Sequence, residues 1–249
     1  MPLFFWINTA RRFLFRSFRS TAALFFMVFS SVAMLIFLSA IAAGINDAMI
    51  RNSVGLFSGH LSGQDLPDTI GREDLIVDGV AQVLKRFKTR CILDHAGHRD
   101  MITLYGVTPS RERITTFLHR KTSQGRFPRD NAQEIYISEM TARNLQAGVG
   151  DTIMIQVNDG PSPLSSTICG IYTTGMEKFD RNVAITPVTG FITATMPWQA
   201  AVFLAGGGTS KEVMTAYTDR GWGSFFSTWE ALMPDLSQLI DLNHVAMWQ

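Results

Sequence analysis

The clearest feature in the pattern of hydrophobic and polar positions is an uncharged apolar run near the start of the chain. No charged residue occurs from Ser20 to Asn46, and the core of this run, Thr21–Ile45, reads TAALFFMVFSSVAMLIFLSAIAAGI. Roughly 20 apolar residues are enough for a helix to cross the hydrocarbon core of a membrane. The pattern therefore predicts a transmembrane helix over residues 20–46.

The residues on either side of this run predict its orientation. Asp47 follows it, and four arginines precede it: Arg11, Arg12, Arg16 and Arg19. The positive-inside rule then places the N-terminus in the cytoplasm and the chain after Asn46 outside. Aromatic residues and arginines alternate in residues 1–19, which is typical of a basic helix lying in the membrane interface. The alternative is a signal peptide cleaved at Ala40-Ile41-Ala42, but the apolar part of a signal is only about 7–15 residues long.

A second uncharged stretch, Asn182–Ser210, is interpreted differently. It contains Pro187, Gly190 and Pro197 together with several threonines, which interrupt a continuous apolar helix. We predict a strand, a short helix and a second strand there, within a domain that extends over residues 47–249.

Periodicity in the remaining sequence predicts alternating helices and strands. The segment Asp47–Ser58 is expected to continue the membrane helix, and Asp74–Phe87 has apolar residues at helical spacing. Other expected helices are 110–120, 139–146 capped by Ser138, a helix after Gly206–Gly208 with a capping box of Thr209 and Glu212, and the amphipathic 233–242. One strand is expected to begin at His60. The other expected strands are 89–93, 101–107, 134–137, 152–157, 167–172 and 200–204. This order predicts one α/β or α+β unit.

Composition and charge exclude some classes of function. The formal net charge is +1, but the four N-terminal arginines leave 18 of the 22 basic residues against 21 acidic ones, a net charge of −3 after residue 46. That balance argues against a nucleic-acid-binding surface. The two cysteines, Cys91 and Cys169, each lie in an apolar strand pattern. We expect two buried thiols, although an oxidising compartment permits one bridge if the strands are adjacent.

One cluster of side chains has the chemistry of a metal site. Asp94, His95, His98 and Asp100 place two imidazoles and two carboxylates within one turn, as zinc or another divalent cation would require. A catalytic site would also need a third, distant ligand and a sheltering pocket. We favour a polar hairpin turn between two strands, and we predict no metal and no cofactor.

Two further motifs do not fit the chemistry that they suggest. The run Gly206-Gly207-Gly208-Thr209-Ser210-Lys211 lacks the Gly-Lys-Ser/Thr order of a phosphate loop. In Gly59-His60-Leu61-Ser62-Gly63 the serine is one residue late for a hydrolase elbow. Because no nucleophile, base and oxyanion site assemble, we predict no catalytic residues and a role in binding or mechanical coupling.

The order of several motifs resembles a known family. A basic helix (NTARRFLFRSFRSTAAL) enters the membrane, and GLFSGHLSG and LYGVTPSRE follow. Then come GRFPRDNAQEIYISEMTARNLQAGVGDTIMIQV, ICGIYTTGMEKFDRNVAI and TWEALMPDLSQLIDLN. This series resembles the permease subunits of ABC transporters of the MacB-type, FtsX-like family, which includes lipoprotein-releasing and macrolide-exporting systems. The most specific part is the strand–helix–Gly-Asp–strand block from Gly125 to Val157.

The resemblance implies an α+β fold in which one N-terminal transmembrane helix is followed by a periplasmic core domain of two α/β lobes. It implies a bacterial inner-membrane protein that is not an enzyme itself. A separate cytoplasmic ABC ATPase would move it, and it would transmit that motion to lipoproteins or other hydrophobic substrates. The expected partners are that ATPase, a second permease copy or paralogue, membrane lipid, and a periplasmic carrier or adaptor protein.

This sequence differs from the family pattern at its C-terminus. Family members continue into three further transmembrane helices, whereas Gln249 ends this sequence at the stalk, where the second span is expected. Two other hypotheses stay open. One is a membrane-tethered binding or sensor domain without transport activity. The other is a membrane-anchored metalloenzyme that uses Asp94, His95, His98 and Asp100.

Overall fold

The structure is a computed structural model that describes residue 6 and residues 18–157, 163–189, 197–205 and 209–232. It divides into two compact units, one of residues 1–49 with 238–249 and one of residues 50–237. Each unit is described separately below.

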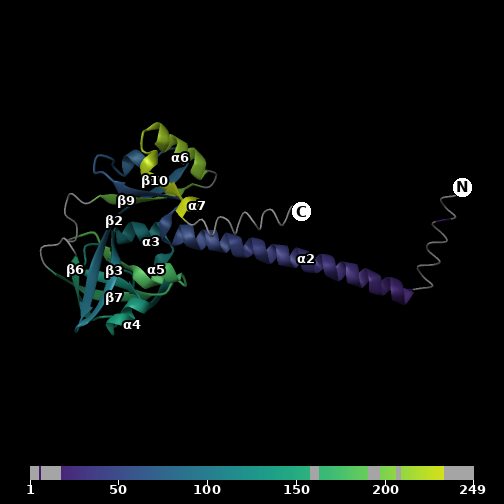
Figure 1. Cartoon of the computed structure of the whole chain (residues 1–249), viewed down its shortest axis with the longest axis horizontal. Coiled ribbons are helices and arrows are strands. Elements are labelled where there is room, and N and C mark those ends of the chain that lie inside the picture. The colour runs from purple at the N-terminus through teal and green to yellow at the C-terminus, as the bar shows by residue number, and fades with distance from the viewer. Residues whose placement is uncertain (1–5, 7–17, 158–162, 190–196, 206–208, 233–249) are drawn as a thin grey trace. The chain divides into compact units, whose positions relative to one another are not determined.

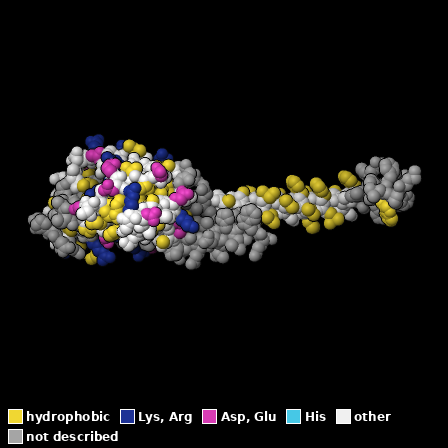
Figure 2. Space-filling view, turned by 90° about the horizontal axis from the view of Figure 1, so that it is seen from above, with side chains coloured by type: hydrophobic (Ala, Val, Ile, Leu, Met, Phe, Trp, Pro, Cys, Tyr) yellow, Lys and Arg dark blue, Asp and Glu magenta, His cyan; other side chains and the backbone are white. Residues whose placement is uncertain are grey.

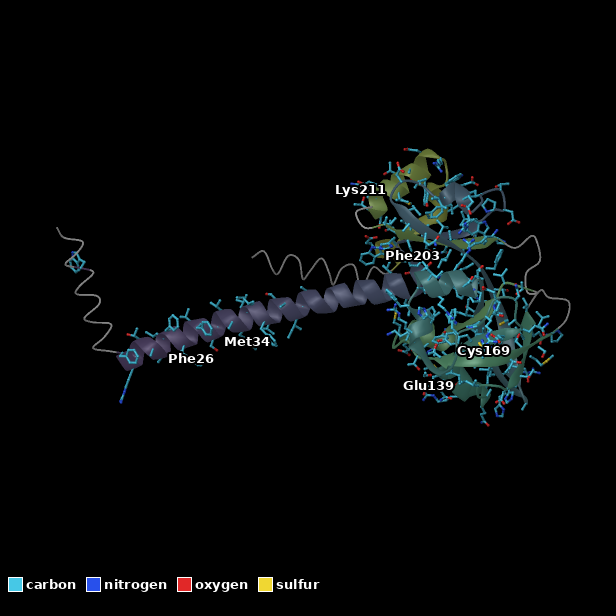
Figure 3. The ribbon with its side chains drawn as sticks, turned by 180° about the vertical axis from the view of Figure 1, so that it is seen from behind. Phe26, Met34, Glu139, Cys169, Phe203 and Lys211 are labelled. Atoms are coloured by element: carbon cyan, nitrogen blue, oxygen red, sulfur yellow. The ribbon has the colours of Figure 1, made fainter. Side chains whose placement is uncertain are left out.

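The first unit is dominated by the helix α2, Phe18–Ser53. Its segment Phe18–Gly44 has a mean hydropathy of 2.5 in its most apolar window, and none of that window is buried. At 1.5 Å per residue this segment is roughly 40 Å long, which exceeds the roughly 30 Å of a hydrocarbon core. Large apolar side chains such as Phe26 and Met34 cover its surface (Figures 2 and 3). The predicted apolar N-terminal helix is confirmed as one long enough to span a membrane.

The second unit is a mixed α/β domain, as the sequence predicts (Figure 1). Its strands are β1 Leu61–Leu66, β2 Val80–His95, β3 His98–Val107, β4 Thr122–Gly125, β5 Glu134–Ser138, β6 Thr152–Val157, β7 Leu164–Tyr172, β8 Val183–Pro187, β9 Trp198–Leu204 and β10 Phe226–Thr228. Its α-helices are α3 Pro109–Thr115, α4 Glu139–Leu145, α5 Glu177–Asn182, α6 Ser210–Asp219 and α7 Trp229–Leu232. Short turns of helix are the π-helical η1 Val54–Ser58 and the 3-10 helices η2 Glu73–Leu75, η3 Leu118–Lys121 and η4 Gly223–Phe225.

These strands form a single hydrogen-bonded sheet with one closed part. The pairing order is β10-β1-β9-β2-β3-β8-β5-β7-β4, and β6 pairs with both β2 and β7. Strands β2, β3, β8, β5, β7 and β6 therefore make a closed ring, in which the β3–β8 and β5–β7 pairs are parallel. Closure removes the exposed edges that invite aggregation. We call the ring with α3, α4 and α5 the ring lobe.

Alternating side chains of the ring strands serve two hydrophobic cores. In β5, Ile135 and Ile137 join one core with Leu145 of α4, whereas Tyr136 points to the opposite face and joins another. That alternation follows from the two-residue period of a strand. Strands whose two faces are both buried have near-continuous apolar sequences, as EIYI and TICGIY do.

The remaining strands form a second lobe, which we call the open lobe. It consists of β1, β9, β10, α6 and the first half of β2, around a core that contains Trp198 and Tyr217. Tyr217 donates its hydroxyl hydrogen to the Leu75 carbonyl at 2.6 Å, and the Trp198 indole donates to the Pro67 carbonyl at 3.3 Å. Both large aromatic residues are thus buried with their polar atoms satisfied.

Several local signals are confirmed. Ser138 caps α4 by accepting from the Thr141 amide at 3.0 Å, and Thr209 and Glu212 form a complete capping box at α6. The two strands predicted in the uncharged stretch are β8 and β9. The short helix predicted between them falls largely on residues 190–196, which lie outside the described residues. The predicted helix 233–242 lies outside them as well.

The prediction of a helix over Asp74–Phe87 is wrong. Only Glu73–Leu75 is helical, and β2 begins at Val80. Two of the valines that suggested a helical face instead pair with β9: Val80 lies opposite Leu204, and Val83 lies opposite Val202. β-Branched residues fit a half-buried pleated surface, so the tertiary pairing outweighs the helical spacing. The sequence also missed α5, a helix of six residues.

Candidate functional site

The cluster Asp94, His95, His98 and Asp100 lies at the tip of the β2–β3 hairpin. His95 and His98 are the last paired residues, and Ala96 and Gly97 turn the chain with φ of 51° and 91°. Two successive positive φ values are those of a type I′ turn, whose twist matches that of the flanking strands. The sequence HAGH is therefore a hairpin connection.

Three of the four side chains of this cluster, those of Asp94, His95 and Asp100, have partners within the hairpin and α4. Asp94 accepts from Arg99 Nε at 2.6 Å, and this bond with Arg99 lowers the pKa of the carboxyl group. His95 Nδ1 lies 3.2 Å from the Leu145 carbonyl oxygen. Asp100 accepts from the Asn144 amide at 3.1 Å. Over the described part of the chain, no group of three or more His, Cys, Asp or Glu residues is placed to hold a metal ion.

The other sequence candidates serve structural roles. Thr209 caps α6, while Gly206–Gly208 lie outside the described residues. Ser62 lies within β1, with its backbone paired to Ser227 and Ala201. Cys91 and Cys169 are both buried, as predicted, and both are free thiols in this structure. Burial raises the pKa of both thiols to about 12. Cys169 lies inside the ring lobe (Figure 3).

A more specific arrangement occurs where α2 enters the domain, which we call the joint. It consists of η1 and the two residues after it, so it extends over residues 54–60. Val54 and Leu56 are buried, and the Gly59 amide donates to the Val54 carbonyl at 3.0 Å in the π-helical pattern. The His60 amide donates to the Val202 carbonyl at 2.8 Å. The joint is thus bonded directly into the sheet through β9.

Two glycines allow this close approach. Gly59 has φ of +75°, and a Cβ there would lie 2.7 Å from the Val202 carbonyl oxygen. A Cβ on Gly55 would lie 2.7 Å from the Phe117 ring. The backbone amide of Phe117 donates to the Gly55 carbonyl at 3.0 Å. The motif GLFSG therefore has glycines where the backbone of the joint contacts other elements.

Beneath the joint lies a buried ion pair between β2 and α3. Arg86 and Glu112 are 3% and 2% exposed, and two parallel bonds of 2.6 and 2.9 Å join Arg86 Nε to Glu112 Oε1 and Arg86 Nη2 to Oε2. Arg86 Nη1 donates to the Phe57 carbonyl of η1 at 2.5 Å. Bidentate pairing of this kind fixes both side chains in one geometry. The guanidinium group thereby links η1, β2 and α3.

The Phe57 ring completes the arrangement. The Arg86 guanidinium carbon lies 3.7 Å from the centre of this ring, which also contacts the rings of Tyr105 at 4.8 Å and Phe179 at 5.1 Å. A cation over an aromatic face is attracted by the ring quadrupole. The last turn before the sheet is therefore fixed by stacking, hydrogen bonding and burial together.

Sequence reasoning did not identify this site. Arg86 and Glu112 are 26 residues apart, and each is an ordinary charged residue in its local sequence. Glu112 lies in a segment correctly predicted as a short helix, but Arg86 lies in the segment incorrectly predicted as a helix. Charged side chains are almost never fully buried unless they are paired, so a correct strand assignment would have marked Arg86 as unusual.

The structure thus has a mixed α/β domain that follows an apolar N-terminal helix long enough to span a membrane. The model of the MacB-like periplasmic core domain matches residues 17–220, and the chain belongs to this family. It is thus part of an ABC transporter permease of the MacB-like type. The family is a transporter component of the inner membrane rather than an enzyme in the usual sense.

The comparison with solved structures supports the same fold through one of its matches, the periplasmic region of MacB. The periplasmic region of MacB from Actinobacillus actinomycetemcomitans has a TM-score of 0.51 and 12% identity, covering 77% of this chain and 95% of that one. The extracellular domain of the noncanonical ABC-type transporter YknZ from Gram-positive bacteria has a TM-score of 0.47 and 16% identity, covering 68% and 97%. A comparison with curated proteins gives no match.

Proposed function

We propose that this chain couples ATP hydrolysis by a separate cytoplasmic ABC ATPase to the handling of lipoproteins or other hydrophobic substrates outside the membrane. The main support is the joint, because an uninterrupted helical segment, α2 followed by η1, leads into a buried set of contacts in the domain. Family membership supports the same role.

The proposal includes an orientation and a set of partners. The basic residues 1–19 lie in the cytoplasm, residues 20–46 cross the inner membrane, and the domain that follows is periplasmic. A second permease copy or paralogue completes the transporter, membrane lipid surrounds it, and a periplasmic carrier or adaptor receives the substrate. No catalytic, metal-binding or cofactor-binding residue of this chain takes part.

Transmission of motion through the joint follows from its chemistry. Separating a buried bidentate ion pair costs much free energy, because each charge would then stay unpaired in a low-dielectric site. Arg86 contacts Phe57 of η1 and Glu112 of α3 simultaneously. A displacement of η1 would therefore move β2 and α3 with it.

The test begins with the native gene product in membranes. We expect affinity purification of the tagged protein to recover an ABC ATPase, and protease accessibility to place the domain outside the membrane. Hydrogen exchange in the ring and open lobes would then be compared with and without ATP. Nucleotide-dependent protection is expected in the native protein and should be lost in a double variant, Arg86→Met with Glu112→Leu, but not in Glu177→Gln, a control that changes an exposed ion pair.

Two results would contradict the proposal. One is purification of the intact native product without any ATPase. The other is an ATPase complex whose extracytoplasmic domain shows the same exchange in every nucleotide state. Either result would favour the membrane-tethered binding or sensor domain, which needs no ATPase.

A further inference from the structure

A small pocket with a partly polar and partly apolar lining lies against the joint, within the second unit. Its volume is about 130 Å³, and it lies between η1 and α7 on one side and four strands of the sheet on the other. The polar side chains that line it beside the joint are Ser62, Gln64, Arg86, Lys88, Tyr105 and Gln199. These residues come from β1, β2, β3 and β9, so the pocket has contacts in both lobes.

Strand register explains why these side chains meet. Lys88 of β2 pairs with Tyr105 of β3, and Arg86 of β2 pairs with Gln199 of β9. Ser62 of β1 pairs with Ala201 of β9, which also lines the pocket. Residues two apart on one strand share a face, so Arg86 and Lys88 both point to this side of β2. The register of the sheet therefore determines which of these side chains line the pocket together.

The hydrogen-bonding capacity of this floor is largely unused. Among the residues that the structure describes, the side chains of Ser62, Gln64, Lys88, Tyr105 and Gln199 make no hydrogen bond and no ion pair with one another or with other residues. Burial raises the pKa of the Tyr105 phenol, so this group stays a donor at neutral pH. Arg86 uses three of its five N–H groups, which leaves two.

The charge of the pocket has one sign. Among the described residues no carboxylate lines it, and both oxygens of Glu112 are already bonded to the Arg86 guanidinium group. The charge of Arg86 is thereby balanced, whereas Lys88 has no acidic partner within the described residues. The lining is therefore cationic and rich in donors, as an anion site requires.

We propose that this pocket binds a phosphate group, either as inorganic phosphate or as the headgroup of an anionic lipid. A volume of 130 Å³ holds roughly four waters at about 30 Å³ each, which is room for one tetrahedral oxyanion. The oxygens of such a group would accept from donors that lie on four strands of the pocket lining. A bound phosphate would also touch Phe57 and Ser58 of η1 and Leu232 of α7.

Occupancy of the pocket would connect the joint with the sheet by a second route. Arg86, paired with Glu112, already bonds to the Phe57 carbonyl of η1. The phosphate would add a contact between η1 and Lys88 of β2. This inference goes beyond the proposed function, because binding is measured without any ATPase. It can fail while ATP-driven coupling holds, and the reverse is equally possible.

The experiment uses the full chain in nanodiscs and compares Lys88→Met with Arg90→Met. Both residues are exposed cations on the same face of β2, but only Lys88 lines the pocket. In neutral-lipid nanodiscs, inorganic phosphate is titrated at constant ionic strength and followed by calorimetry. A parallel series replaces neutral lipid with phosphatidylglycerol and measures thermal unfolding.

A saturable effect of phosphate that weakens about tenfold or more in Lys88→Met but not in Arg90→Met supports binding of the free anion. A stabilisation by phosphatidylglycerol with the same dependence on Lys88 supports the lipid headgroup. Tyr105→Phe should weaken whichever effect is found. The proposal would be overturned if Lys88→Met and Arg90→Met behaved equally in both series. It would also be overturned if neither phosphate nor phosphatidylglycerol had a saturable effect.

Discussion

Removing the negative charge of Glu112 is the sharpest perturbation of the joint. The substitution Glu112→Gln keeps the size and shape of the side chain, but it leaves the Arg86 guanidinium group buried without its counter-charge. It also turns an amide N–H₂ group toward one of the guanidinium nitrogens, where a carboxylate oxygen now accepts. The variant thus isolates the electrostatic contribution of the pair.

The structure sets the size of the effect. Both members of the pair are about 3% exposed in their side chains, so solvent screens the uncompensated charge very little. Breaking a pair of this kind costs about 3–5 kcal/mol. For a domain of this size that corresponds to a fall in Tm of roughly 6–20 °C. The double variant Arg86→Met with Glu112→Leu removes both charges, so it should recover most of this loss.

The assay is unfolding of the full chain in detergent, followed by tryptophan fluorescence. Trp198 is fully buried in the open lobe and reports on the intact domain. Glu177→Gln is the matched control, because Glu177 forms an exposed i,i+4 pair with Arg181 and should contribute at most about 0.5 kcal/mol.

Two outcomes would refute the reasoning. Equal stability losses in Glu112→Gln and Glu177→Gln would mean that the joint pair is effectively solvated. A double variant as unstable as Glu112→Gln would mean that lost packing, rather than the unpaired charge, causes the destabilisation.

Three further predictions concern individual residues. Gly59→Ala should destabilise the domain by more than the roughly 1–2 kcal/mol that a left-handed non-glycine residue costs, because its Cβ would also lie 2.7 Å from a carbonyl oxygen. At Gly97 nothing lies within 4 Å of the added Cβ, so Gly97→Ala should cost only the roughly 1–2 kcal/mol of backbone strain. Urea titration of both variants measures the difference. Burial lowers the pKa of His60 from its ordinary 6.5, so the unfolded chain binds the proton more readily, and Tm should fall as pH drops below about 6.5 in the native protein but less in His60→Gln. Cys91 and Cys169 should resist maleimide in the folded chain and both react in guanidinium chloride, as counted by mass spectrometry; labelling of either thiol in the folded state would contradict their burial.

The sequence predicts the parts of the fold that carry their own local signals. The apolar run specifies α2, and the Ser138 cap and the Gly-Asp turn specify the β5–α4–β6 block. The polar segment around Gly97 is the hairpin tip that its composition indicates. In each case the deciding interactions lie within a few residues, so a pattern along the chain is enough.

The parts that the sequence does not predict depend on contacts between distant residues. Val80–Phe87 has apolar residues at positions that fit a helix, and only pairing with β9, more than a hundred residues later, makes it a strand. The joint depends on that same assignment, because Arg86 is buried only when β2 extends through it. A local pattern gives no information about which charged residue will find a partner 26 residues away.

The 16-residue strand β2 belongs to both lobes, and this has a mechanical consequence. Its first half pairs with β9 in the open lobe, and its second half pairs with β6 and closes the ring. Because the two lobes share an unbroken strand, no flexible loop acts as a hinge between them at β2. They can move relative to each other there only if β2 twists or if its hydrogen bonds to neighbouring strands break. Arg86 and Lys88 lie along this shared stretch. A force applied at η1 would therefore twist β2, and because both lobes contain this strand, both would change conformation together.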